Sequence, residues 1–232
     1  MYRKKCIREG QVKLKRAIVV LGGKIEEDWA VGELEKLRPF TVIAADRGLE
    51  FCGKAGIRPD YIVGDFDSSS KEEAEQISRN GKIPMDTYKP EKDMTDADIG
   101  LEKAIAIGAG EVFFIGATGG RLDHELSCMY DLVKLRKRGI EGWILDPQNR
   151  IRMPAGHEVR IRREEQYGKF VSCISVGGPV TGVTMKGFYY PLEGYTMKAG
   201  DGGLTVSNQI VADEAVITYE NGDLLVIESR DL

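Results

Sequence analysis

The stretch TVIAADRGLEFCGKAGIRPDYIVGDFDS, residues 41–68, decides the fold class. It contains apolar runs at 41–45 and 61–63, separated by a segment at 48–55 with the length and composition of a short helix. A buried strand, a helix and a second buried strand form the repeating unit of a parallel sheet. Asp46 follows the first strand and Asp65 comes shortly after the second. The stretch therefore predicts a parallel sheet with acidic groups at the carboxyl ends of its strands.

The same alternation continues on both sides of this stretch. The further elements that we expect are strands at 17–21, 111–115 and 143–145, and helices at 28–37, 71–79, 95–107 and 122–138. Thr95 and Asp98 have the spacing of a capping box at the start of their helix. In the last helix, the spacing predicts a buried face formed by Leu122, Leu126, Met129 and Val133. We expect an α/β domain at 1–147, with a mainly parallel sheet flanked by helices.

The pattern changes after Pro147, where short apolar runs alternate with glycine-rich turns and no amphipathic helix is evident. We predict a smaller C-terminal all-β sandwich domain at 148–232, with LTV at 204–206 among its strands. Asn221-Gly222 lies between two apolar runs and predicts a type I′ turn that joins them as a hairpin.

Composition excludes several classes of protein. The formal net charge of −4 over 232 residues provides no basic field for nucleic acid or for a membrane surface. The longest aliphatic run, 17–21, is far shorter than the roughly 20 apolar residues of a membrane-spanning helix. The four cysteines form no Cys-x-x-Cys pair, which indicates neither a zinc site nor a disulfide framework, so we expect a cytoplasmic protein. The basic segment 1–16 reads as a solvated N-terminal arm.

Acidic side chains at the strand ends predict a magnesium site. Asp65 and Asp67 alternate along an extended segment, and Asp96 begins a later helix at the same edge of the predicted sheet. Carboxylate oxygens are the ligands that Mg²⁺ prefers, and a cation would relieve the repulsion between close carboxylates. Two alternatives stay open: the aspartates cap the following helix, or Asp65 is the nucleophile of a phosphatase.

The segment GATGGRLDH, residues 116–124, is the candidate phosphate site. Its small residues permit close approach of the backbone, the following helix offers free N–H groups, and Arg121 adds a bidentate cation. The segment lacks the Gly-Lys-Ser/Thr ending of a Walker A loop, and no Gly-x-Gly-x-x-Gly fingerprint follows the first strand. The alternative is an ordinary connection between a strand and a helix.

Four motifs in order resemble those of thiamine pyrophosphokinases: GDFDS at 64–68, DMTDAD at 93–98, GATGGRLDH at 116–124 and VSN at 206–208. The resemblance covers about residues 17–228. It implies transfer of the terminal pyrophosphoryl group of ATP to the hydroxyl of thiamine, giving thiamine diphosphate and AMP. It also implies a Mg²⁺-dependent homodimer with ATP on the α/β domain and thiamine at the subunit interface.

The resemblance also implies roles for individual residues. Those for Mg²⁺ are Asp65, Asp67 and Asp96; those for the nucleotide are Asp46, Arg121 and Asp123; those for thiamine are Ser207 and Asn208. From their positions we add Arg47, Thr118 and His124 for the nucleotide and Tyr190 for thiamine, although Arg47 and Tyr190 stand where the family often has Gly and Trp. Asp96 is also the candidate base, and we count Asp65 and Arg121 with it as catalytic. Tyr190 offers an aromatic face to the thiazolium cation, unless it and Tyr189 belong to the sandwich core. The competing functions are a pyrophosphokinase for a pterin-like alcohol, the aspartate-nucleophile phosphatase, and a nucleotide- or thiamine-sensing protein without turnover.

Overall fold

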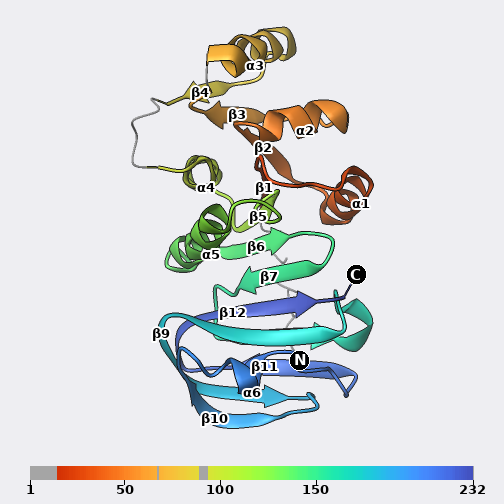
Figure 1. The fold of residues 1–232 in the computed structure, drawn as a ribbon, viewed down its shortest axis with the longest axis vertical. Helices are drawn as coiled ribbons and strands as arrows, with labels where there is room; N and C mark the ends of the chain where they lie inside the picture. Colours follow the sequence, from red (N-terminus) through yellow and green to blue (C-terminus); the bar gives the residue numbers. More distant parts are fainter. Residues whose placement is uncertain (1–14, 67, 89–93, 232) are drawn as a thin grey trace, which may run out of the picture.

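The computed structural model describes residues 15–66, 68–88 and 94–231 of the chain. Over these residues the strands form one sheet, in the order β4-β3-β2-β1-β5-β6-β7-β12-β9-β11-β8, with β10 on the side of β9 (Figure 1). The strands of the N-terminal half are β1 (Arg16–Val20), β2 (Thr41–Ala45), β3 (Tyr61–Gly64), β4 (Met85–Thr87), β5 (Glu111–Ile115) and β6 (Glu141–Leu145). All neighbouring pairs among these six are parallel, as predicted, although β4 was not among the five strands expected from the sequence.

Helices cover both faces of this parallel sheet. They are α1 (Glu27–Leu37), α2 (Gly48–Lys54), α3 (Ser68–Gly81), α4 (Asp96–Ala106) and α5 (Leu122–Arg136). Alternate residues of β1 belong to the cores on opposite faces: Ile18 lies in the core that also contains residues of α1, α2 and α3, and Val19 lies in the core that contains residues of α4 and α5. Because both faces are buried, the strands read as continuous apolar runs in the sequence. Among the described residues, no helix is long and apolar enough to cross a membrane.

The direction in which the chain adds strands reverses beside β1. From β1 the chain builds outward through β2 and β3 to β4, and then returns to place β5 on the other side of β1. In open sheets of this kind, ligands bind outside the carboxyl ends of the strands at such a switch point. The topology thus marks the carboxyl ends of β1 and β5.

Helix α5 buries a different face from the predicted one. Leu122 and Leu126 are exposed, at 67% and 46% of their maximal surface, whereas Cys128, Leu132 and Leu135 are buried. The reason lies in the sheet, where a Cβ atom on Gly142 would stand only 2.8 Å from Leu132 and 2.9 Å from Leu135. The missing side chain lets these two leucines approach β6, which sets the rotation of the helix. Met129 and Val133 are partly buried, as part of that packing.

The C-terminal half continues the sheet and folds it into a second layer, as expected for a sandwich. β7 (Asn149–Met153) pairs antiparallel with β6, and β12 (Asn221–Ser229) pairs with β7. The 17-residue strand β9 (Phe170–Lys186) pairs first with β12 and then with β10 (Leu192–Met197) and β11 (Glu214–Thr218). β8 (Glu158–Arg162) lies beyond β11. The predicted boundary at 147/148 falls in the β6–β7 turn, across which the sheet is continuous.

Two local predictions for this half are wrong. The runs on either side of Asn221-Gly222 do not form a hairpin, because β11 and β12 each pair with β9 in different layers. Gly222 serves a close backbone contact instead, since a Cβ atom there would lie 2.5 Å from the carbonyl oxygen of Pro179. The second error concerns Leu204, which belongs to the short helix α6 (Gly202–Thr205) and to no strand.

Candidate active site

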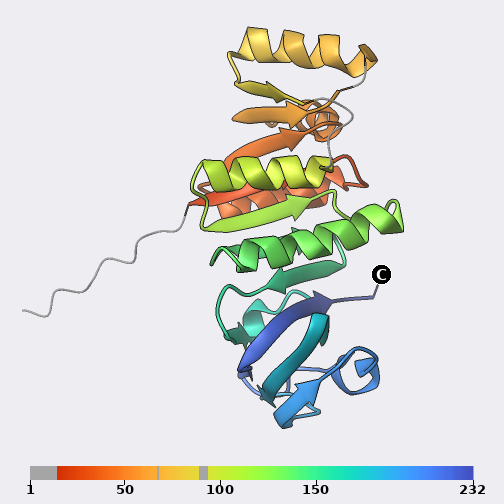
Figure 2. The same cartoon turned by 90° about the vertical axis from the view of Figure 1, so that its left-hand side faces the viewer.

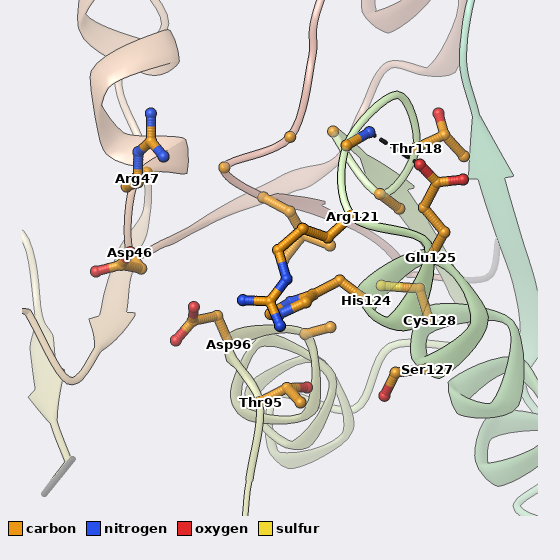
Figure 3. Close-up of a pocket in the computed structure, with 17 residues that line it drawn as sticks. Asp46, Arg47, Thr95, Asp96, Thr118, Arg121, His124, Glu125, Ser127 and Cys128 are labelled. Atoms are coloured by element: carbon orange, nitrogen blue, oxygen red, sulfur yellow. Dashed lines mark hydrogen bonds between the residues drawn. The ribbon is translucent and has the colours of Figure 1, made fainter.

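A pocket of about 390 Å³ lies at the switch point of the sheet. Its walls come from the carboxyl ends of β1, β2 and β5 and from the first turns of α4 and α5 (Figure 3). Six of the residues predicted to bind nucleotide or metal line it: Asp46, Arg47, Asp96, Thr118, Arg121 and His124. Asp65 and Asp123 do not line it. The structure thus brings together side chains that lie up to 78 positions apart in the sequence.

The floor of the pocket is a contact between two glycine-containing turns. The amide of Gly23, after β1, donates a hydrogen bond to the carbonyl oxygen of Gly116, after β5, over 3.0 Å. A Cβ atom on Gly23 would lie 2.2 Å from that oxygen, and Gly116 has a φ of 75°. Only glycine permits this approach, because the neighbouring atoms are backbone atoms that cannot move aside. The turn at 116–120 is therefore held in one place beside β1.

The start of α4 forms a second wall and carries Asp96. The predicted capping box is confirmed: the Thr95 side chain accepts from the amide of Asp98, and the Asp98 carboxylate accepts from the amide of Thr95 over 3.0 Å. This reciprocal pair fixes the first turn, in which Asp96 lies half-buried. In Figure 3 the side chains of Asp96, Arg121 and His124 point into the same space.

The opposite wall is the first turn of α5, with Arg121 at its N-cap. The guanidinium of Arg121 forms a two-pronged contact with Asp123, at 3.1 Å from Nε to Oδ1 and 2.6 Å from Nη2 to Oδ2. This pairing lowers the pKa of Asp123 and raises that of Arg121, chiefly through the hydrogen bonds between them. Both side chains are largely exposed, at 74% and 62%. Asp123 thus contacts Arg121, and Arg121 in turn lines the pocket.

Two acidic residues that sequence reasoning missed hold the glycine-rich turn. Glu125 accepts a hydrogen bond from the amide of Gly120 over 2.8 Å, and Asp146 accepts one from the hydroxyl of Thr118 over 2.8 Å. Glu125 lines the pocket. Asp146 directly follows β6, so the rule that singled out Asp46 and Asp65 would also have found it.

The carboxyl end of β2 places Asp46 and Arg47 at the rim of the pocket. Asp46 has a φ of 47°, in the left-handed region, and its amide donates to the carbonyl of Val63 over 2.9 Å. Such backbone strain in a non-glycine residue concentrates at functional sites. Arg47 is 70% exposed and lies 3.8 Å from Glu50, one turn along the same helix.

The carboxylates near the pocket fit Mg²⁺ in donor chemistry. Asp96 lines the pocket, and Asp65 is half-buried after β3, the strand beside β2. Asp67, the third predicted ligand, lies outside the described residues. Among the residues that are described, no group of three His, Cys, Asp or Glu side chains forms a ready-made metal cage. Mg²⁺ does not require one, because one or two carboxylates usually bind it together with phosphate oxygens and water.

The residues predicted for thiamine lie on the C-terminal half and do not line this pocket. Tyr189 and Tyr190 are 65% and 62% exposed and meet edge to face at 4.8 Å, so the alternative that they belong to the core is wrong. Asn208 is buried. Its side-chain oxygen accepts from the backbone N–H of Tyr190 over 3.0 Å, and its side-chain nitrogen donates to the backbone C=O of Tyr190 over 2.7 Å. Ser207 adopts a φ of 59°. Asn208 thus fixes the backbone that carries Tyr190.

A cluster of three charged side chains joins α4 to α5. Lys134 contacts Asp98 of the capping box and lies 2.8 Å from Asp131, whose side chain is fully buried. Burial raises the pKa of Asp131 to about 7, although Lys134 acts against that shift. Burial also opposes ionisation of Asp98, but the hydrogen bonds from Lys134 and Thr95 outweigh it and lower its pKa.

Two family models and a curated relative match the sequence of this chain. The family model for the thiamin pyrophosphokinase catalytic domain matches residues 37–144, and that for the thiamin pyrophosphokinase vitamin B1 binding domain matches residues 156–224. The thiamine pyrophosphokinase of Bacillus subtilis (strain 168) is 32% identical over 189 residues, which cover 82% of this chain and 87% of that protein.

Solved structures give the same result. The crystal structure of thiamine pyrophosphokinase from Bacillus subtilis matches with a TM-score of 0.81 at 30% identity, covering 94% of this chain and 100% of the other. That of thiamin pyrophosphokinase from Geobacillus thermodenitrificans matches with a TM-score of 0.77 at 29% identity, covering 93% and 98%. These findings support neither a pterin-like acceptor nor an aspartate-nucleophile phosphatase.

Proposed function

The chain belongs to the thiamine pyrophosphokinase family, and we propose that it transfers the terminal pyrophosphoryl group of ATP to the hydroxyl of thiamine. The hydroxyl oxygen attacks the β-phosphorus, the bond from that phosphorus to the oxygen bridging it to the α-phosphorus breaks, and AMP leaves. The products are thiamine diphosphate and AMP. In such a reaction the protein contributes mainly positioning and electrostatic stabilisation.

The pocket at the switch point of the sheet carries this proposal. It combines a glycine-rich turn, the first turn of α5 and the Arg121 guanidinium on one side with Asp96 on the other. Helix N-termini and arginine favour phosphate oxygens, whereas carboxylates favour a cation or a proton. Arg121 has five N–H donors, so it can bind a phosphate oxygen while it keeps a contact with Asp123. Asp46, Arg47, Thr118 and His124 complete the proposed nucleotide site.

Mg²⁺ belongs to the proposal, with Asp65, Asp67 and Asp96 as its protein ligands. The chemistry that the ion supplies when bound is neutralisation of charge on the phosphate oxygens. Asp96 also accepts the proton of the attacking hydroxyl. Its first-turn position, fixed by Thr95 and Asp98, supports this assignment because a general base must be held within hydrogen-bond reach of its proton.

The thiamine site is proposed on the C-terminal half at the interface of a homodimer, with Tyr190, Ser207 and Asn208 at its edge. The face of Tyr190 can bind the thiazolium cation, and its exposure supports that use. Further exposed apolar side chains on the same half are Leu204, Val206 and Val211, and those on α5 are Leu122, Leu126 and Tyr130. A second chain would cover such surfaces. In Figure 2, α6 lies on the side of the molecule toward which β5 points, which is also the side of the pocket.

A cytoplasmic location is proposed with this activity. ATP is the co-substrate, and Cys52, Cys128 and Cys173 are free thiols. Burial raises the pKa of each to about 12, so these side chains act as small apolar groups rather than as nucleophiles.

Incubation with ATP, Mg²⁺ and thiamine tests the activity. Equal amounts of AMP and thiamine diphosphate are expected, and release of ADP or an absence of turnover would contradict the proposal. Asp96→Asn should lower kcat by at least 100-fold, since it removes the base and a metal ligand. Asp28→Asn, in the first turn of α1 and outside the pocket, is the matched control and should keep full activity. Sedimentation equilibrium should give the mass of two chains.

A further inference from the structure

A chain of hydrogen bonds runs from the glycine-rich turn of the pocket into the junction of the two halves. The hydroxyl of Thr118, which lines the pocket, donates to Oδ2 of Asp146 over 2.8 Å. Oδ1 of Asp146 accepts from the amides of Gln148 and Asn149 over 2.8 and 2.7 Å. The carboxylate is therefore held by its own turn and has one oxygen directed at Thr118.

The C-terminal half also holds Asp146, through a hydrogen bond from Tyr167 to its backbone. The hydroxyl of Tyr167 donates to the backbone carbonyl of Asp146 over 2.5 Å. The oxygen of that hydroxyl also accepts a hydrogen bond from Nε1 of Trp29 on α1 over 2.9 Å. One phenol thus joins three segments far apart in the sequence: α1, the β6–β7 turn and the loop before β9. Both capacities of the hydroxyl are used, so it has one orientation.

The ring of Tyr167 is itself fixed. The guanidinium of Arg230 lies 4.2 Å from the ring centroid, and that of Arg150 lies 5.5 Å from it. The amide of Tyr167 donates to Glu228 over 2.9 Å, and Glu228 is buried and paired with Arg150 at 2.8 Å. A group anchored in this way can hold its partner in place, because little freedom is left to lose.

We infer that Asp146 and Tyr167 are positioning residues for the nucleotide pocket: Tyr167 fixes the β6–β7 turn, and Asp146 then fixes Thr118 and the glycine-rich turn. The C-terminal half, proposed to bind thiamine, thereby orders the part of the N-terminal half that is proposed to bind the ATP phosphates. The inference rests on the proposed function for the identity of the nucleotide, whereas the hydrogen bonds that carry it are independent of that function. Neither residue lines the pocket, so both act through Thr118.

Tyr167→Phe removes the hydroxyl and keeps the ring between its two arginines. Binding of α,β-methylene-ATP, measured by calorimetry with Mg²⁺, should weaken about threefold to tenfold, the range of one or two lost hydrogen bonds. The KM for thiamine should stay unchanged. In a Thr118→Val background, Tyr167→Phe should have no further effect on nucleotide affinity, because the path from Tyr167 to the turn is already cut.

Tyr219→Phe is the matched control. Its hydroxyl also donates to a backbone carbonyl, that of Gly156 over 2.8 Å, and accepts from Arg136 over 3.5 Å; within the described residues it bonds to neither Asp146 nor Thr118. Nucleotide affinity should stay at the wild-type value in this variant. Unchanged affinity in Tyr167→Phe, an equal loss in both tyrosine variants, or additive losses with Thr118→Val would overturn the inference.

Hydrogen exchange tests the same inference without any nucleotide. The amides of residues 116–120 should exchange faster in Tyr167→Phe than in Tyr219→Phe, and equal rates would contradict the positioning role. A protein that shows this difference but produces no AMP from ATP and thiamine would refute the proposed function alone.

Discussion

Replacement of the buried Asp131 by Asn should change how the stability of the protein depends on pH. The Asp131 side chain is fully buried on α5, one of its oxygens pairs with Lys134 at 2.8 Å, and the other has no hydrogen-bond partner in the described part of the chain. Burial raises the pKa of this carboxyl to about 7 from the usual 3.8. Asn has nearly the same shape and does not ionise in this range.

The sign follows from proton binding in the two states. Between about pH 4 and pH 7 the native state keeps the proton on Asp131 while the unfolded state has lost it, so the free energy of unfolding falls as pH rises. The contribution of Asp131 is therefore fully present below pH 4 and lost above pH 7. The difference between the two pKa values corresponds to about 4 kcal/mol. Asp131→Asn should lack this fall, so its stability relative to wild type should improve by up to about 4 kcal/mol from pH 4 to pH 8.

Urea unfolding at pH 4, 5, 6, 7 and 8, followed by circular dichroism, measures this difference directly. Leu132→Val, at the next and equally buried position of α5, is the control. It should lower the free energy of unfolding by about 1 kcal/mol at every pH, because it removes apolar contact and no ionisable group. Parallel pH profiles for Asp131→Asn and wild type would refute the argument from burial.

Three further substitutions test the pocket and the proposed thiamine site. Thr95→Ala breaks the capping box and should cost about 1 kcal/mol in urea unfolding and lower kcat, with unchanged kcat counting against a positioning role for the cap. Gly23→Ala should lose about 1–3 kcal/mol and bind nucleotide more weakly, whereas Gly32→Ala, with open space on α1, should gain about 0.5–1 kcal/mol in the same assay. Asn208→Ala releases the backbone of Tyr190 and should raise the KM for thiamine at unchanged KM for ATP; an equal rise in both would refute its local role.

Most of the parallel half of the fold was predictable from the sequence, because its central strands are buried on both faces and α4 begins at a strong local signal. The capping box at Thr95 is an example, since the two residues that form it are three positions apart. The rotation of α5 was not predictable in the same way. It depends on Gly142 of a strand that pairs elsewhere, so the local spacing of Leu122 and Leu126 carries no information about it.

The candidate site shows the same division between local and long-range information. Asp46, Asp96 and Arg121 follow from their positions at strand and helix ends, and all three line one pocket. Asn208 was predicted as a substrate contact from its motif, whereas its bonds to Tyr190 depend on the pairing of distant segments. Asn221-Gly222 has a strong hairpin signal that β9 overrides, because β9 offers pairing partners to both neighbouring strands.

Hydrogen bonding runs without interruption from β6 through β7 to β12, and this pairing limits where the chain can be divided. A piece ending at residue 147 would leave β6 with a row of unpaired backbone groups, and the remaining piece would expose β7 in the same way. Free strand edges of this kind recruit other chains and aggregate. The two halves are therefore not exchangeable modules joined by a linker, and a graft of either one onto another scaffold would need a substitute strand at the cut.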